Sequence, residues 1–276
     1  MAGEVRDIVI VGAAGRMGRA IVREAAGDRR IRIVAALERE GSDAIGRDAG
    51  ALAGAGPLGV EVAVDAPLGG DACIIDFSSG AGAAAMAARA ADAGAGMVIG
   101  ATGFSDSDEA RIASAATRTL ILKAGNMSLG VNLIARLVRE AASVLGPHHF
   151  DAEIVETHHR RKVDAPSGTA LMLADAIDRG RGDAPPAPRR DGHRGGARAP
   201  GDVGFAVVRG GGVIGEHTVA FIGDMEAIEI SHRAFDRALF ARGAIEAAIW
   251  VADAVAAGRR PALVGMDAVL DSLSGT

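Results

Sequence analysis

A glycine-rich turn near the N-terminus constrains the fold of this chain more than any other feature. Residues 7–12 read DIVIVG, and the stretch GAAGRMG places glycines at positions 12, 15 and 18 ahead of a helical pattern. A strand, a turn of this spacing and a helix expose backbone N–H groups that can bind a pyrophosphate. The next apolar run, IRIVAALE, ends at Glu38, where an acidic side chain can accept hydrogen bonds from an adenosine ribose. The pattern predicts a dinucleotide site, although a tight turn without a ligand would use the same glycines.

Three more apolar runs alternate with alanine-rich helical stretches after this βαβ unit. Short, fully apolar strands separated by helices are typical of a parallel sheet with helices on both faces. We therefore expect a Rossmann-like α/β domain over residues 1–127, with residues 41–70 as an irregular connection that contains one strand near 59–65. The three runs read DACIIDFS, MVIGATG and LILKAGN, at residues 71–78, 97–103 and 120–126.

Two of the loops after these strands consist mostly of small residues. They read GATGF at 100–104 and KAGNMSLG at 123–130. Ligands of open parallel sheets bind outside the carboxyl ends of the strands, so both loops are expected to face the nicotinamide half of a dinucleotide. Turn formation alone would explain the same small residues.

The pattern changes after Asn126. A helical stretch leads to the strand DAEIVETHH, and further strand patterns follow in close succession. Strands without crossover helices indicate a mixed or antiparallel sheet, so we expect a second, α+β domain over residues 128–238. Residues 179–202 are rich in Pro, Gly and Arg and are expected to form an excursion loop. A long helix in the C-terminal segment 239–276 is expected to return to the first domain.

Composition argues against several classes of protein. The net charge is −5, without the broad basic excess of a general nucleic-acid binder. No apolar stretch approaches the roughly 20 residues of a membrane span, and the N-terminus lacks the apolar region of a signal peptide. The single cysteine, Cys73, lies in an apolar run and suits a reducing compartment. We expect a cytoplasmic protein that binds neither nucleic acid nor membrane.

The stretch ETHHRRKVDAPSGTA is a local concentration of positive charge. Two histidines, two arginines and a lysine occupy residues 158–162 at the end of a strand, and a helix is expected to start near Pro166 and Ser167. The N–H groups of that helix start, together with the cations, suit a carboxylate ligand. A zinc site lacks a cysteine or carboxylate at ligand spacing, and a nucleic-acid site lacks interleaved aromatic residues. An anion site and a solvated, charged surface run remain as alternatives.

Several motifs together resemble the dihydrodipicolinate reductases, or 4-hydroxy-tetrahydrodipicolinate reductases, of diaminopimelate and lysine biosynthesis. They are VGAAGRMG, GATGF, ETHHRRKVDAPSGTA, GFAVVRGGGVIGEHTVAF and SHRAFDRALFARGA, and they cover essentially the whole chain. The resemblance implies NAD(P)H-dependent reduction of a cyclic dicarboxylate, 4-hydroxy-tetrahydrodipicolinate, to tetrahydrodipicolinate. It also implies that the second domain binds this substrate and builds a homotetramer through an open mixed sheet.

The same resemblance implies roles for individual residues. His158 and Lys162 would carry out the acid–base chemistry, and His159 would hold the substrate carboxylates together with the backbone of Gly168 and Thr169. No metal is implied. The residues that would bind NADH or NADPH are Gly12, Ala13, Ala14, Gly15, Arg16, Met17, Glu38, Arg39, Gly100, Ala101, Thr102, Ala124, Gly125, Asn126 and Met127.

Departures from the family pattern bear on the cofactor preference and leave the proposed reacting groups in place. In the family that this chain resembles, Thr, Phe and Tyr are common at or near the positions that Ala101, Met127 and Val264 occupy here. The pair Glu38 and Arg39 favours use of both cofactors, since a carboxylate suits a free ribose and a guanidinium suits a 2′-phosphate. Two other functions stay open: an NAD(P) oxidoreductase acting on an amino-dicarboxylate, similar to an aspartate dehydrogenase, and a nucleotide-sensing protein without catalysis.

Overall fold

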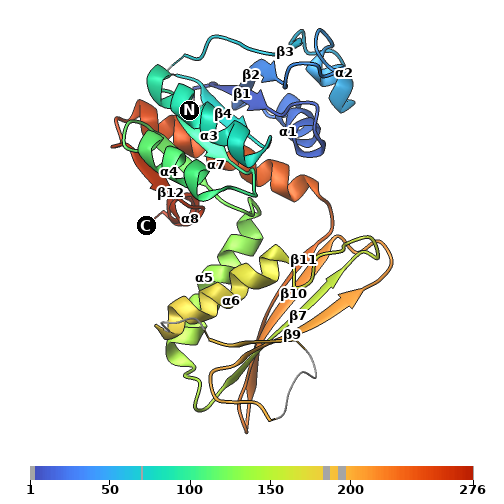
Figure 1. Cartoon of the computed structure of the whole chain (residues 1–276), viewed down its shortest axis with the longest axis vertical. Coiled ribbons are helices and arrows are strands. Elements are labelled where there is room, and N and C mark those ends of the chain that lie inside the picture. The colour runs from blue at the N-terminus through green and yellow to red at the C-terminus, as the bar shows by residue number, and fades with distance from the viewer. Residues whose placement is uncertain (1–3, 70, 183–186, 192–196, 276) are drawn as a thin grey trace. The chain divides into compact units, whose positions relative to one another are not determined.

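The computed structural model describes residues 4–69, 71–182, 187–191 and 197–275, and it consists of two compact units (Figure 1). Unit 1 combines Met1–Ser128 with Ala238–Thr276, and unit 2 is the intervening Leu129–Arg237. Each unit has its own sheet and its own hydrophobic core. The C-terminal segment thus belongs to the same unit as the glycine-rich turn.

Unit 1 is built on a seven-stranded sheet in the order β12-β6-β5-β4-β1-β2-β3. Every neighbouring pair is parallel, so the carboxyl ends of the strands lie along one edge. The central strands are short and buried on both faces, which explains their continuous apolar sequences. The strands are β1 (Arg6–Val11), β2 (Ile31–Leu37), β3 (Val62–Ala63), β4 (Cys73–Asp76), β5 (Met97–Ile99), β6 (Leu120–Lys123) and β12 (Ala262–Val264).

Helices α1 and α7 pack on one face of this sheet, and α3 and α4 pack on the other. Alanines fill the buried side of α3, so this helix lies close to the strands. Ser105 and Asp108 form a capping box that fixes the start of α4. The helices of unit 1 are α1 (Arg16–Ala26), α2 (Ala49–Ala53), α3 (Gly80–Ala93), α4 (Asp106–Ala115), α7 (Ala238–Ala256) and α8 (Asp267–Ser274).

Unit 2 contains a mixed five-stranded sheet in the order β11-β10-β7-β9-β8. Strand β10 is antiparallel to both of its neighbours, whereas β7, β9 and β8 are parallel. Helices α5 and α6 cover one face, where Ile154 and Phe205 join the core. On the other face, Val155 and Val208 are exposed. The elements are α5 (Leu129–Val144), β7 (Asp151–His158), α6 (Gly168–Arg181), β8 (Arg189–Asp191), β9 (Val203–Arg209), β10 (Gly215–Ile222) and β11 (Ala227–Ala234).

The predicted fold class, a Rossmann-like domain with a second mixed-sheet domain, is confirmed. The prediction of a loop over 179–202 is wrong in part, because α6 continues to Arg181 and β8 pairs with β9. Arg189 and Arg190 are ion-paired with carboxylates of α6 and Asp202, so these charges belong to a folded edge. Residues 183–186 and 192–196 of that segment lie outside the described residues. The connection 41–70 contains α2 besides the expected strand. The sequence patterns did not predict β12 or α8.

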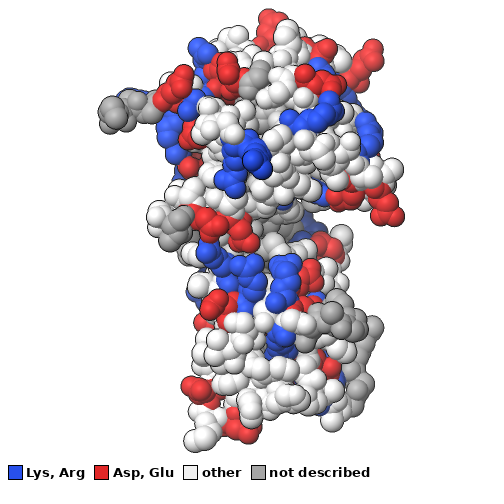
Figure 2. Space-filling view, turned by 90° about the vertical axis from the view of Figure 1, so that its left-hand side faces the viewer, with Lys and Arg blue, Asp and Glu red and all other residues white. Residues whose placement is uncertain are grey.

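Charges of both signs are mixed on the face of the molecule in Figure 2, where Lys and Arg lie in small groups among Asp and Glu. Several surface arginines have carboxylate partners, such as Arg32 with Asp7 and Arg30 with Asp28. Exposed pairs of this kind are screened by water, so they affect the surface potential more than the stability. Within the described ranges, no helix is both long and apolar enough to span a membrane.

Candidate active site

The turn after β1 adopts a conformation that favours glycine. Gly12 has a φ of +74°, and the N–H groups of Gly12 and Ala13 both donate to the carbonyl oxygen of Leu37 in the neighbouring strand. A Cβ on Gly18 would lie 2.1 Å from the carbonyl oxygen of Gly12. The third glycine of the motif therefore allows α1 to pack against the turn, as a dinucleotide-binding turn requires.

Glu38 lies beside this turn, directly after β2. Its Oε2 accepts the N–H of Ala14 at 3.1 Å, and its Oε1 accepts the N–H of Arg39 at 3.1 Å. The Arg39 side chain is exposed. Gly15, the N-cap of α1, offers no side chain to the N–H groups of the first helical turn. The end of β2 therefore carries a carboxylate and an exposed guanidinium, and the end of the neighbouring β1 leads to a helix start without a side-chain cap.

The loops after β5 and β6 lie at the same edge of the sheet, because β6, β5, β4, β1 and β2 are adjacent and parallel. Gly100 packs on the ring of Phe77, and a Cβ at this position would lie 2.1 Å from the ring carbon Cζ. The structure thus brings the predicted cofactor residues of all four loops to one edge of unit 1. Among them Ala101 and Met127 are buried, Met17, Ala124 and Asn126 are half-buried, and Arg16, Thr102 and Gly125 are exposed.

Strand β4 adds a buried acid that the sequence argument missed. Asp76 is fully buried, and its Oδ1 accepts hydrogen bonds from the N–H and the hydroxyl of Ser78. Its Oδ2 has no hydrogen-bond partner among the described atoms. Burial raises the pKa of Asp76, against the opposing effect of the Ser78 hydrogen bonds. The polar sequence DFSS, directly after an apolar run, was the available signal.

Strand β7 leads to the predicted catalytic residues in unit 2. His158 is its last residue and is 7% exposed. His159 and Lys162 follow in a turn, where the N–H of Lys162 donates to the carbonyl oxygen of His159 at 3.1 Å. The ammonium group of Lys162 forms an ion pair with Asp164 at 2.8 Å, which the sequence argument did not foresee. The turn therefore separates a buried imidazole from a half-buried ammonium group.

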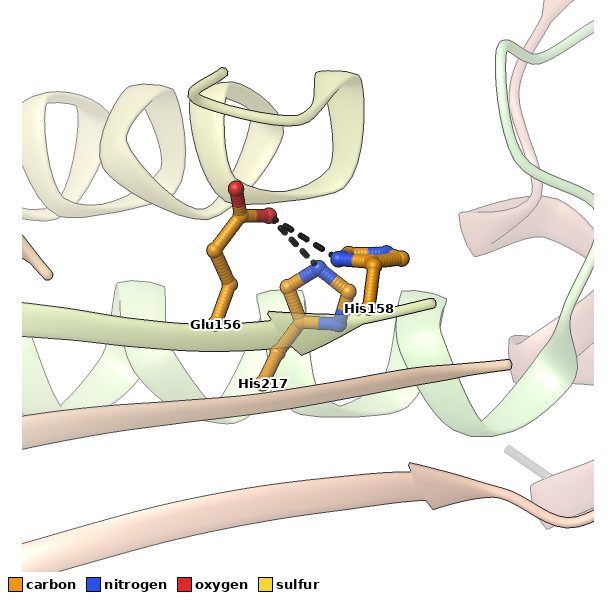
Figure 3. Close-up of side chains that lie close together, drawn as sticks. All are labelled: Glu156, His158 and His217. Atoms are coloured by element: carbon orange, nitrogen blue, oxygen red, sulfur yellow. Dashed lines mark ion pairs between the residues drawn. The ribbon is translucent and has the colours of Figure 1, made fainter. Parts of the chain in front are cut away.

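Glu156 is the centre of this cluster (Figure 3), although the sequence argument did not select it. It is fully buried, and its Oε1 accepts hydrogen bonds from the N–H of Ser167 at 3.0 Å and from Arg209 at 2.9 Å. Its Oε2 lies 3.4 Å from Nδ1 of His158 and 3.5 Å from Nε2 of His217. The two imidazole rings are 5.0 Å apart in an edge-to-face arrangement. A single buried carboxylate thus faces two imidazoles and a guanidinium.

The surroundings of these groups set their protonation. Burial acts to raise the pKa of Glu156, but hydrogen bonds from Ser167 and Arg209 outweigh it and hold this pKa below its usual value. Burial lowers the pKa of His158, while the charge of Glu156 acts in the opposite direction. Burial and the neighbouring His158 lower the pKa of His217 to about 4. At neutral pH the cluster therefore contains an ionised carboxylate and an uncharged His217.

The expectation that no carboxylate lies near the histidines at ligand spacing is wrong. Glu156, His158 and His217 each offer one ligand atom, all within 4.8 Å of one another. The second carboxylate oxygen is held by Arg209, however, and Nε2 of His217 is hydrogen-bonded to the hydroxyl of Ser167 at 3.1 Å. A divalent cation here would face a guanidinium, so we assign no metal to the cluster.

Helix α6 starts beside the cluster. Its N-cap is Ser167, whose hydroxyl accepts the N–H of Ala170 at 3.2 Å and whose own N–H is bound to Glu156. Gly168 and Thr169 are the first two residues of the helix. Because helix N-termini favour negative charge, the predicted substrate-binding backbone lies where a carboxylate would be stabilised.

Strand register explains why several members of the cluster were missed. His217 lies opposite Glu156 in the β7–β10 pairing, and Arg209 lies opposite His158 in the β7–β9 pairing. The alternation in EIVETH could have placed Glu156 and His158 on the same face as the apolar Ile154. No sequence signal fixes the register between strands so far apart in the chain.

Comparisons with known proteins cover both units. The family model for the N-terminus of dihydrodipicolinate reductase matches residues 6–127, and the model for its C-terminus matches residues 130–270. A 4-hydroxy-tetrahydrodipicolinate reductase of Rhizobium meliloti (strain 1021) is 52% identical, over 88% of this chain and 91% of the relative. The enzyme of the same name from Chelativorans sp. (strain BNC1) is 49% identical, over 98% of this chain and 96% of the relative.

Solved structures agree with the architecture. A dipicolinate-bound dihydrodipicolinate reductase from Paenisporosarcina sp. TG-14 has a TM-score of 0.69 and 21% identity, covering 95% of this chain and 97% of the other. An amine dehydrogenase from Mycobacterium smegmatis has a TM-score of 0.60 and 19% identity, covering 95% of each chain. At these identities the structural matches support the two-domain fold alone.

Proposed function

The chain belongs to the dihydrodipicolinate reductase family, and from this membership we propose that it reduces 4-hydroxy-tetrahydrodipicolinate to tetrahydrodipicolinate with a nicotinamide cofactor. This reduction is a step of diaminopimelate and lysine biosynthesis. The structural observation that supports this site in unit 2 is the 3.0 Å hydrogen bond from the N–H of Ser167 to Glu156. It fixes the start of α6 beside the end of β7, so a helix start suited to carboxylates and a buried imidazole occur together in unit 2.

The cofactor is proposed to bind along the carboxyl edge of the unit 1 sheet. The close approach of Gly18 to Gly12 and the uncapped start of α1 support a pyrophosphate at this turn. Glu38 supports a ribose and the exposed Arg39 a 2′-phosphate, so we propose that both NADH and NADPH are used. A bound nicotinamide would supply the hydride, and the residues of unit 2 would handle substrate charge and protons.

His158 and Lys162 are proposed to supply the proton that the reaction needs. Reduction of the substrate ring shifts an electron pair onto a neighbouring atom, and a positioned acid must protonate that atom. His158 is a buried imidazole, and Lys162 is an ammonium group in the following turn. His159 and the N–H groups of Gly168 and Thr169 are proposed to hold the two carboxylates, which would keep the substrate in register with the acid.

A homotetramer is proposed to form through the open face of the unit 2 sheet. Val155 and Val208 are 40% and 49% exposed on the face opposite α5 and α6. A sheet face that no described helix covers, with exposed branched apolar side chains, is typical of an association surface. We also propose that the enzyme works in the cytoplasm, where a free, buried Cys73 would stay reduced.

An assay with freshly generated substrate tests the activity. The unstable cyclic substrate is made in the cuvette by the synthase that forms it, and oxidation of NADH or NADPH is followed by absorbance. We expect oxidation that requires both the synthase and this enzyme. Failure to oxidise either cofactor with fresh substrate, together with oxidation of aspartate in the presence of NAD(P)⁺, would instead support an amino-dicarboxylate dehydrogenase.

A further inference from the structure

Glu156 lies close to both histidines of the cluster, yet the proposed function assigns it no role in the proton transfer. We infer that Glu156 positions His158 for proton donation: the carboxylate holds the Nδ1 side of the ring, so Nε2 is the atom that releases the proton. This inference rests on the proposed function, because it presumes that His158 acts as an acid. Glu156 itself would touch neither substrate nor cofactor, and so it is a positioning residue.

The hydrogen bonds to one oxygen of the Glu156 carboxylate determine where the other oxygen points. Oε1 is held by the N–H of Ser167 and by Arg209, which fixes the plane of the group. Oε2 is thereby directed at Nδ1 of His158, 3.4 Å away (Figure 3). This distance exceeds the usual N–H···O range of about 2.7–3.2 Å, so the contact acts mainly as a charge pair. An opposite charge this close favours the protonated ring.

Gly215 leaves space on the other side of the ring. A Cβ at this position would lie 3.1 Å from Nε2 of His158 and 3.4 Å from its Cδ2. The first distance is tighter than an ordinary van der Waals contact, so any larger residue would press on the ring at Nε2. One nitrogen of His158 thus lies beside a buried carboxylate, while a glycine leaves room next to the other.

The proton balance follows from this arrangement. When protonated His158 acts as the acid, the Nε2–H bond breaks and its electron pair stays on the ring. The neutral ring keeps its proton on Nδ1, toward Glu156, and the carboxylate remains ionised. Among the described residues, the charged and titratable groups that act on the ring are Glu156 on β7, Arg209 on β9, His217 on β10, and His159 and Lys162 in the following turn.

A Glu156→Gln variant tests the inference through its pH profile. Losing the negative charge should lower the pKa of His158, so the fall of kcat/KM with rising pH should begin at lower pH, by about one unit or more. Activity should recover toward the wild-type value as the pH is lowered. A Glu140→Gln variant makes the same chemical change at an exposed site on α5 and should keep the wild-type profile. A loss that is equal at every pH would overturn the inference, because it would indicate a structural role.

Measurements on the wild-type protein cover the case in which Glu156→Gln does not fold. Nitrogen-15 spectra of the histidine rings report which nitrogen carries the proton in the neutral form, and we expect Nδ1–H for His158. An Nε2–H tautomer would overturn the inference. These spectra do not depend on turnover, so they separate the two proposals. An inactive wild-type enzyme would count against the proposed function, whereas the tautomer of His158 tests the role of Glu156.

Discussion

His217 lies directly opposite Glu156 in the β7–β10 ladder, with Nε2 3.5 Å from the carboxylate. Opposed residues of antiparallel strands share a face, so the register of this single pairing brings the buried acid and base together. A slip of one residue would turn His217 to the open face of the sheet. Activity measurements on variants of unit 2 therefore need a matching measurement of the fold, such as circular dichroism.

Replacing the proposed acids tests whether His158 and Lys162 take part in the chemistry. Loss of a general acid typically costs about 10²–10⁴ in rate, so Lys162→Ala and His158→Ala should each lower kcat at least about a hundredfold. NADPH affinity, measured by fluorescence titration, should stay near wild type, because the proposed cofactor residues all belong to unit 1. His159→Ala should mainly raise KM, as expected for a binding contact. Near-normal kcat in both acid variants would mean that neither side chain donates the proton, and the catalytic acid would have to lie elsewhere.

Arg39 is expected to distinguish the two cofactors. We predict that NADH and NADPH support rates within about tenfold of each other, a difference of about 1.4 kcal/mol. Arg39→Ala should raise KM for NADPH and leave KM for NADH nearly unchanged, because only NADPH carries the 2′-phosphate. Arg32→Ala, an exposed arginine of β2 paired with Asp7, is the matched control. An equal loss with both cofactors would show that Arg39 does not contact the phosphate.

The glycine at position 18 should be indispensable for the turn. In Gly18→Ala the new Cβ would meet the carbonyl oxygen of Gly12 at 2.1 Å, and backbone must move to relieve this. We expect a loss of about 1–3 kcal/mol in the free energy of unfolding, together with weaker cofactor binding. Gly27→Ala, at the other end of α1, places its Cβ 3.7 Å from the nearest atom outside its neighbours and should be tolerated. Urea titrations and fluorescence titrations of both variants make the comparison, and unchanged NADH affinity in Gly18→Ala would rule out a pyrophosphate at this turn.

The buried His217 should make the stability depend on pH. Its pKa in the folded protein is about 4, below the value of about 6.5 expected in the unfolded chain. Between these values the unfolded state binds a proton that the folded state excludes, so stability is greatest above pH 6.5 and falls as the pH drops toward 4. The shifted pKa of His217 changes the free energy of unfolding by on the order of 3 kcal/mol across this pH range. His217→Gln should show a smaller loss of urea stability between pH 7.5 and pH 5 than wild type, and His148→Gln, at an exposed position, should follow wild type. A variant that loses as much stability as wild type would show that His217 is not the responsible group.

Local sequence rules explain why the proposed cofactor residues of unit 1 lie together better than they explain the cluster of unit 2. The glycines of GAAGRMG and the acidic end of β2 are neighbours through one βαβ unit, and the hydrogen bond between Ala14 and Glu38 joins them. His158 and Ser167 were placed by similar local signals, a strand end and a helix start. Arg209 and His217 enter the cluster through strand pairings across long stretches of chain, and the residues of those strands do not determine the register by themselves. Pro and Arg are typical of loops and give no local signal for strand β8, but Asp178 and Asp202 hold its arginines at a sheet edge.

The open face of the unit 2 sheet provides the last prediction, a homotetramer that depends on it. Val155 and Val208 lie on adjacent strands, β7 and β9, and point to the face that α5 and α6 leave open. Burying a charged side chain against apolar neighbours is strongly unfavourable, so Val155→Lys should dissociate the assembly while unit 2 stays folded. Val144→Lys, at an exposed position on α5, is the matched control and should leave the assembly intact. Light scattering at micromolar concentration gives the mass of the wild-type protein and of both variants. A monomeric wild-type protein would refute the tetramer, and a tetrameric Val155→Lys variant would move the interface to another surface.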